Sequence, residues 1–156
     1  MTKMAGIPER HEVFDHVVRE GTYGRMRMLL YTLAPSLIVQ SAMLNGRLMG
    51  CYDAELEAIT IDRTMILDDK KCALVHELAH WVYDDDSRPP YGAKREQATR
   101  KLTAETLISM DAYRNAETMY EGNIWLMAHE LAVPAQIVKD WQRLVAPSIT
   151  HTITRK

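Results

Sequence analysis

Residues 72–83 read Cys-Ala-Leu-Val-His-Glu-Leu-Ala-His-Trp-Val-Tyr, an apolar run that two histidines and one glutamate interrupt. If the run is helical, His76 and His80 lie one turn apart on the same face. Two neutral imidazoles in that position can bind one Zn²⁺, and Glu77 lies beside them as a possible general base. The H-E-x-x-H pattern therefore predicts a helix that carries the core of a zinc-dependent peptidase site. The alternative is an ordinary amphipathic helix with two histidines on its polar face.

Length and composition set the broad class of the chain. Its 156 residues, of which 47% are hydrophobic and 26% charged, are enough to bury a core without disulfides. A formal net charge of −2 gives no electrostatic reason to expect direct nucleic-acid binding. The first ten residues lack the apolar segment of a secretory signal, and no run approaches the roughly 18 apolar residues of a transmembrane helix. Cys51 and Cys72 do not make a disulfide framework. We therefore expect a cytoplasmic protein without a membrane partner.

The segments before the motif predict two helices and a small sheet. The helices are expected at 8–20 and 25–33, and the strands at 36–44, 47–52 and 56–62. Asn45-Gly46 is a two-residue hairpin signal, which predicts that the first two strands pair with each other. The third strand is expected to be an edge to which an extended peptide could add as a further strand. Asp68-Asp69 is expected to cap the motif helix.

The remainder of the chain is predicted to be mainly helical. A loop at 84–92 is followed by helices at 93–108, 111–119, 124–132 and 134–144, with a break at Glu121-Gly122-Asn123 and a fraying tail from Pro147. The predicted fold class is α+β, with a small three-stranded sheet packed on a zincin-type HExxH helix and a mainly helical C-terminal half. Three regions are expected: a zinc metallopeptidase domain (1–120), a two-helix cap of the same domain that is similar to a helix-turn-helix (121–146), and a flexible tail (147–156).

Catalytic zinc usually takes three protein ligands and keeps a fourth position for water, so one more ligand is needed. Asp86, six residues after His80, is one candidate, although a metzincin also needs a glycine where this chain has Tyr83. The other candidate is a glutamate of the following helix, either Glu96 or Glu105. Those two lie about half a turn out of phase, so they cannot both face the metal.

The neighbours of the two glutamates favour Glu96. Thr99 and Thr103 share its face, and such small side chains would let this helix lie close to the motif helix. Glu105 has Arg100-Lys101 nearby and suits the surface. The alternative for Glu96 is a glutamate in the N-terminal turn that stabilises the helix dipole.

Residues 74–80, Leu-Val-His-Glu-Leu-Ala-His, are followed by Glu-x-x-Thr-x-x-x-Thr-Ala-x-x-Leu-Ile at residues 96–108. This arrangement resembles the ImmA/IrrE family of metallo-endopeptidases, in which HExxH is followed by E-x-x-A-x-x-x-A-A-x-x-L-(L/I). The resemblance covers roughly residues 36–145, and the chain departs from the pattern by having threonine at 99 and 103, where alanine is usual. It implies His76, His80 and Glu96 as zinc ligands and Glu77 as the catalytic base.

The resemblance also implies a biological role. Members of this family are encoded on phages, mobile elements and some bacterial chromosomes, usually beside a helix-turn-helix repressor. They act as antirepressors that cleave this repressor, and some relatives work with toxin–antitoxin pairs instead. The expected protein is therefore a hydrolase with Zn²⁺ as cofactor and a helix-turn-helix repressor as its protein substrate.

The segment 124–144 supports a second hypothesis, because its apolar spacing resembles a helix-turn-helix. A DNA-reading helix should present several basic or amide side chains to the groove. Here these are Gln136, Lys139, Gln142 and Arg143, opposed by Asp140. That set is small, so a two-helix cap is favoured. The alternative function is a DNA- or protein-binding regulatory module in which the HExxH helix is not catalytic.

Other candidates are set aside on spacing alone. Cys72, four residues before His76, is expected to be a small apolar residue. The sequence from His129 to Val133 imitates the motif but has valine in place of the second histidine. Surface positions are expected for His11, His16 and His151. No oxyanion donor is assigned among the nearby candidates Tyr83, Arg88 and Tyr91.

Overall fold

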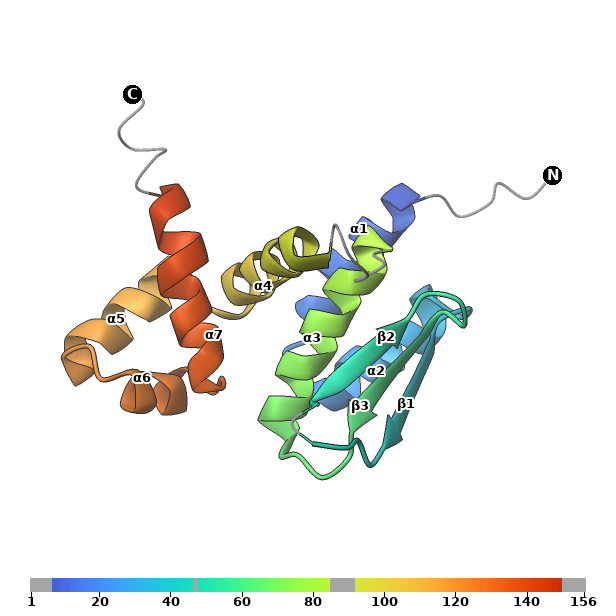
Figure 1. The fold of residues 1–156 in the computed structure, drawn as a ribbon, viewed down its shortest axis with the longest axis horizontal. Helices are drawn as coiled ribbons and strands as arrows, with labels where there is room; N and C mark the ends of the chain where they lie inside the picture. Colours follow the sequence, from blue (N-terminus) through green and yellow to red (C-terminus); the bar gives the residue numbers. More distant parts are fainter. Residues whose placement is uncertain (1–6, 47, 85–91, 150–156) are drawn as a thin grey trace. The chain divides into compact units, whose positions relative to one another are not determined.

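The computed structural model describes residues 7–46, 48–84 and 92–149. Its elements are α1 (Ile7–Val18), α2 (Tyr23–Leu33), β1 (Ile38–Ala42), β2 (Gly50–Asp53), β3 (Ala58–Asp62), α3 (Leu67–Tyr83), α4 (Gly92–Leu107), α5 (Met110–Tyr120), α6 (Ile124–Leu131), α7 (Ala135–Asp140) and the π-helical segment η1 (Trp141–Val145) (Figure 1). The predicted α+β class is confirmed. None of the described helices is long and apolar enough to cross a membrane.

The chain forms two compact units, Met1–Asp86 and Ser87–Lys156, called here the first and the second unit. Within the second unit, α4 packs on α7 and η1, while α5 packs on α6. Trp141 of η1 stacks on Tyr113 of α5 with 4.0 Å between ring centroids, and its Nε1 donates to the carbonyl of Ile108 at 3.1 Å. This grouping differs from the expected boundary at residue 120, because α4 and α5 share a core with the C-terminal helices.

The end of the second unit is helical for longer than expected. Residues 146–149 continue the helix beyond η1, so the chain does not fray at Pro147. The rest of the expected tail, 150–156, lies outside the described residues. The same is true of residues 85–91, which make up most of the loop expected at 84–92.

The sheet of the first unit has the order β1-β3-β2, with β1 parallel and β2 antiparallel to β3. Two expectations are therefore wrong: β1 and β2 do not pair across Asn45-Gly46, and β3 is the central strand rather than an edge. The reason is burial, because Ile59 and Ile61 of β3 are fully buried, whereas β1 and β2 carry exposed residues. The strand with the most apolar surface takes the centre, and both of its neighbours cover it.

The hairpin of this sheet joins β2 to β3 instead. Asp53 accepts hydrogen bonds on Oδ1 from the backbone N–H groups of Glu55 (3.0 Å) and Leu56 (3.2 Å), which closes an Asx-type turn. Glu57 then adopts a left-handed conformation with φ of 49° and leads into β3. This turn has neither glycine nor asparagine at its centre, so the sequence carries no strong hairpin signal there.

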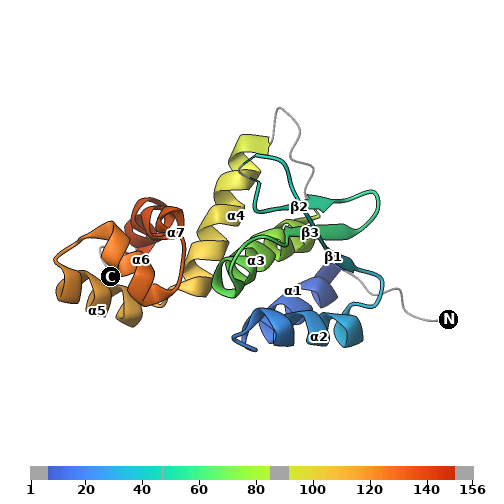
Figure 2. The ribbon, with the colours of Figure 1, turned by 90° about the horizontal axis from the view of Figure 1, so that it is seen from below.

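Helix α3 is the central element of the first unit. It packs on β2 and β3 and also on α1 and α2 (Figure 2). Its residues from Cys72 to Val82 are buried with the exception of His76, which is half-buried. The helix begins after Ile66, which makes no side-chain cap bond, so the expectation that Asp68-Asp69 caps it is wrong. The two carboxylates lie in the first turn instead, where they stabilise the positive end of the helix dipole.

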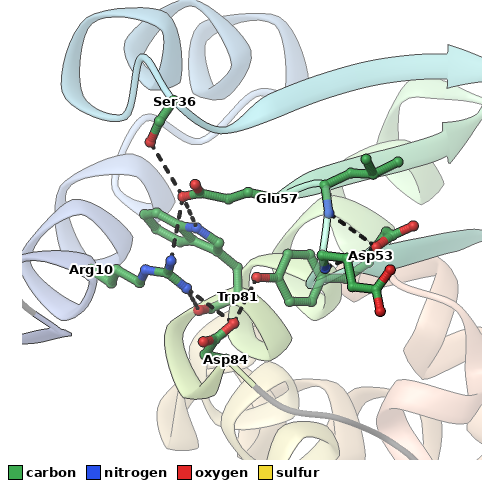
Figure 3. A network of polar contacts seen from close by, with 9 residues as sticks. Arg10, Ser36, Asp53, Glu57, Trp81 and Asp84 are labelled. Carbon is green, nitrogen blue, oxygen red and sulfur yellow. Dashed lines mark hydrogen bonds and ion pairs between the residues drawn. The ribbon is translucent and has the colours of Figure 1, made fainter.

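Figure 3 shows the polar network at the C-terminal end of α3. Arg10 of α1 donates from Nη1 to the Trp81 carbonyl at 2.7 Å, and its guanidinium lies 5.0 Å from the centroid of the Trp81 ring. Glu57 accepts from Trp81 Nε1 at 3.0 Å and pairs with Arg10 at 3.4 Å. The last carbonyls of an α-helix lack partners within the helix, so Arg10 bonds one of them and joins α3 to α1 and the start of β3.

Tyr52 extends this network to β2, because its hydroxyl donates to Asp84 Oδ1 at 3.1 Å. Burial is the main reason that the pKa of Tyr52 rises to about 12. The phenol therefore keeps its proton at neutral pH and stays a donor. Strand β2 is thereby fixed to the end of α3.

Strand β1 has its outer edge partly covered by Arg27 of α2. The Nη2 atom of Arg27 donates to the Val39 carbonyl at 2.8 Å, and Nη1 donates to Ser41 Oγ at 3.4 Å. A charged side chain on an edge strand opposes pairing with another strand. Of the two edges, β2 is therefore the more accessible to an added strand.

Asp62, at the end of β3, makes a testable contribution to stability. Its Oδ1 accepts from the backbone N–H (2.9 Å) and the hydroxyl (2.8 Å) of Thr64. These two bonds are the main reason that the pKa of Asp62 lies below its ordinary value of 3.8. A carboxyl whose pKa is lower in the folded state stabilises the fold above its unfolded-state pKa, and this stabilisation is lost as pH falls through the folded-state pKa.

We expect Asp62→Asn to melt at a lower temperature than the parent at pH 7, and the difference to shrink as the pH falls below about 4. Thermal unfolding followed by circular dichroism at several pH values measures it. Asp15→Asn, at an exposed position of α1, is the matched control. A loss that is equal at pH 7 and pH 3 would contradict the role of the charge.

Candidate metal centre

The two histidines of the motif lie on one face of α3, as their spacing predicts. Their ring centroids are 4.9 Å apart with an interplanar angle of 76°, and ring nitrogens of His76 and His80 lie within 4.8 Å of each other. His80 is 9% exposed and His76 is half-buried. Burial of the core face holds α3 in place, and the helical spacing then sets the relative position of the two histidines.

The donor pair fits a zinc ion. Zinc binds histidine nitrogen at about 2.0–2.1 Å in tetrahedral geometry, which puts two ligand nitrogens about 3.3 Å apart. Rotation of the two imidazoles about their side-chain bonds can bring the nitrogens from the observed arrangement to this spacing. Two imidazoles and one carboxylate form a ligand set that catalytic zinc uses.

Glu77 follows His76 in the chain and lies on the side of α3 that faces β2. It is 7% exposed, although glutamate is rarely buried to this extent. A Cβ atom placed on Gly50 of β2 would lie only 3.2 Å from Glu77 Cγ, so this part of the side chain packs closely on the backbone of Gly50. The candidate base is thus held next to the two histidines and against the edge strand of the sheet.

Glu96 belongs to α4 of the second unit, where it is half-buried. It lies beyond the first turn of α4, which contains no acidic residue, so the helix-dipole alternative has little support. Its Oε1 lies 3.7 Å from Nε of Arg100, one turn further along. Glu105 is exposed, as expected for a surface carboxylate. The role of Glu96 as third ligand stays a prediction.

Thr99 and Thr103, on the face of Glu96, are fully buried. Thr103 Oγ1 donates to the Thr99 carbonyl at 2.7 Å, which satisfies its hydroxyl inside the helix. Thr99 Oγ1 is buried and has no hydrogen-bond partner among the described residues. The face of α4 that carries Thr99 and Thr103 is therefore buried, as their small side chains led us to expect.

The other candidates divide as follows. Cys72 is 2% exposed, and burial raises the pKa of its thiol to about 12. It is therefore a protonated thiol at neutral pH and fits the expected apolar role. His11 and His16 are exposed on α1, as expected, and His129 is exposed on α6. Tyr83 is 41% exposed. The remaining candidates lie outside the described residues: Asp86, Arg88, Tyr91 and His151.

The helix-turn-helix-like segment consists of α6 and α7 with Ala132 in the left-handed conformation between them, at φ of 56°. Two of its four candidate reading residues make bonds within the unit: Gln136 donates to Asp140 Oδ1 and Gln142 donates to the Tyr113 hydroxyl, both at 2.9 Å. Asp140 is only 5% exposed. These bonds give the two amides a structural role and count against their use in recognising DNA bases.

Gly50 is the residue of this site that sequence reasoning missed. Its signal is a lone glycine at the start of a strand, which often marks a place where other atoms approach the backbone closely. The sequence does not say which atoms approach. Comparison of the chain with protein-family models, with curated proteins and with solved structures gives no match.

Proposed function

We propose that this protein is a zinc-dependent endopeptidase. The observation that carries the proposal is the arrangement on α3: the ring nitrogens of His76 and His80 lie within 4.8 Å of each other, and Glu77 is buried beside them against β2. A purely structural amphipathic helix would not require two histidines one turn apart next to a buried glutamate.

The residues of the site have separate roles in this proposal. His76, His80 and Glu96 hold the metal, and Glu96 is supplied by α4. A zinc ion so held would polarise the scissile carbonyl and lower the pKa of a water molecule to about 7. Glu77 accepts the proton of this water as the water oxygen attacks the carbonyl carbon. Glu77 then gives the proton to the amine nitrogen as the C–N bond breaks.

The proposed substrate is an extended peptide segment that adds to the sheet at β2. Because β2 is antiparallel to β3 and Asp62 N–H donates to the Met49 carbonyl at 2.9 Å, residues 49, 51 and 53 face β3. The N–H and C=O groups of Gly50 and Tyr52 therefore point to the outer edge, where a peptide can bond them. This edge replaces β3 as the proposed binding strand, and it borders Glu77.

The substrate class follows from the resemblance of the chain to the ImmA/IrrE family. We propose that the protein cleaves a helix-turn-helix repressor and thereby induces a phage, a mobile element or a stress regulon. Support comes from the H-E-x-x-H motif followed by the glutamate helix at the spacing of that family. Main-chain pairing at an edge tolerates many sequences, so the choice of repressor would depend on further contacts.

The test is metal content followed by cleavage. We expect about one zinc per chain, by elemental mass spectrometry, in protein dialysed against trace zinc. We also expect the gene of this protein to lie beside one for a helix-turn-helix repressor. The zinc-loaded protein should cleave that repressor, and removal of the metal with a chelator should abolish cleavage. A parent protein without bound zinc would contradict the proposal. Zinc without cleavage of that repressor would contradict the substrate assignment.

A further inference from the structure

The close approach of Gly50 to Glu77 carries an inference that rests on the proposed function. We propose that Gly50 is a positioning residue: by having no side chain, it lets the general base lie against the edge strand. Gly50 would touch neither metal nor the reacting atoms, and its effect would pass through Glu77.

The space around Gly50 is filled on three sides. A Cβ atom there would lie 3.1 Å from Ile61 Cδ1, 3.1 Å from the Thr60 carbonyl oxygen and 3.2 Å from Glu77 Cγ. The two distances to carbon are shorter than the optimal separation of non-bonded carbon atoms, about 3.5–4.0 Å, and the distance to the oxygen is equally short. Thr60 belongs to β3, which is paired with β2, so its carbonyl cannot retreat without disturbing the ladder. The adjustment to a methyl group therefore falls on the two side chains, those of Ile61 and Glu77.

Backbone conformation does not explain this glycine. The described glycines with positive φ are Gly21, Gly46 and Gly122, and Gly50 is not among them. It is an ordinary strand residue that alanine could replace without backbone strain. What an alanine would lack is room, because Ile61, the Thr60 carbonyl and Glu77 occupy the space.

A displaced Cγ matters because the carboxyl carbon of Glu77 is bonded directly to it. The carboxylate must meet the water that attacks the substrate, and a misplacement of about 1 Å can reduce the rate by about a hundredfold. The atoms nearest to a Cβ at Gly50 belong to Ile61, Thr60 and Glu77 and to neither histidine, so the ring positions of His76 and His80 should be unchanged. Gly50 is thus expected to affect proton transfer and to leave metal binding unaffected.

The first test is Gly50→Ala, with Gly24→Ala as the matched control. A Cβ at Gly24, an exposed position of α2, would meet no atom within 4 Å. In the zinc-loaded protein, with fluorophore-labelled casein as probe, we expect kcat of Gly50→Ala to fall about tenfold or more. KM and zinc content should stay near those of the parent. Gly24→Ala should match the parent in all three quantities.

The second test needs no substrate. If the methyl group of Gly50→Ala presses on Glu77 Cγ, removing that atom by Glu77→Ala should relieve the contact. We therefore expect Gly50→Ala to lower the melting temperature more in the parent than in the Glu77→Ala background. The contacts with Ile61 and Thr60 should leave a smaller loss in both.

The outcomes separate this inference from the proposed function. A Gly50→Ala protein with the kcat of the parent, or with the same melting-temperature loss in both backgrounds, overturns the positioning role. Neither result contradicts the proposal that the protein is a peptidase. A parent that binds no zinc, or that binds zinc and leaves casein intact, counts against the peptidase proposal. In that case the melting-temperature comparison still decides whether Gly50 and Glu77 are coupled.

Discussion

Glu77→Gln is expected to bind zinc as the parent does and to lose nearly all peptide cleavage. Glutamine has almost the shape of glutamate, so it can keep the buried position against β2, but it cannot accept a proton from water. Loss of a general base typically costs about 10²–10⁴ in rate. Zinc content by elemental mass spectrometry and kcat on the same substrate measure the two effects separately.

Glu130→Gln is the natural control for that substitution. Glu130 is exposed and lies in the sequence His-Glu-Leu-Ala at the end of α6, which matches the motif except for its second histidine. It should lose no activity. Cleavage by Glu77→Gln at the parent's rate would remove Glu77 from the role of base.

Glu96→Ala is expected to have the largest effect on metal binding of any substitution outside α3. Removing even an outer-shell partner of a zinc ligand costs about 10–100-fold in affinity, and removing a ligand should cost at least as much. We therefore expect zinc affinity to fall about a hundredfold or more, as measured by competition with a chromogenic chelator. The matched control is Glu105→Ala, nine residues further along the same helix, which should bind zinc as the parent does.

The pair of substitutions decides between the two glutamates that the sequence offers. Circular dichroism of both variants without zinc shows whether α4 is still folded, so a loss of metal can be separated from a loss of structure. Unchanged affinity in Glu96→Ala together with reduced affinity in Glu105→Ala would reverse the assignment. Unchanged affinity in both would place the third ligand elsewhere.

Helix positions in this chain follow from local signals. Gly21 and Asn123 lie at positions where a helix must end or begin, and the structure places α1, α5 and α6 accordingly. Asn123 caps α6 by accepting from the N–H groups of Trp125 and Leu126. Such signals act within one or two turns of the chain, so they can be read without knowing the tertiary structure.

The order of the strands could not be predicted in the same way. Asn45-Gly46 is a local signal, and Gly46 does adopt positive φ, at 70°. The pairing is decided by Ile59 and Ile61, whose complete burial requires a strand on each side and a helix above. Burial depends on residues far apart in sequence, so it overrides a turn signal that favours a simpler hairpin.

The candidate site shows the same division. His76, Glu77 and His80 follow from spacing within one helix, and the structure places them as that spacing predicts. The contact of Glu77 with Gly50 joins residues 27 positions apart, and only the packing of α3 on β2 creates it. The side chains that share one face of a helix can be predicted from the sequence, but the residues that this face contacts cannot.

The network at the end of α3 has an optical consequence. Trp81 is 3% exposed, with its indole bonded to Glu57 and its ring beneath Arg10, whereas the other two tryptophans, Trp125 and Trp141, belong to the second unit. Replacing those two with phenylalanine leaves one tryptophan, which lies in α3 directly after His80. Its emission would report the unfolding of the first unit alone, so this unit could be followed separately from the second.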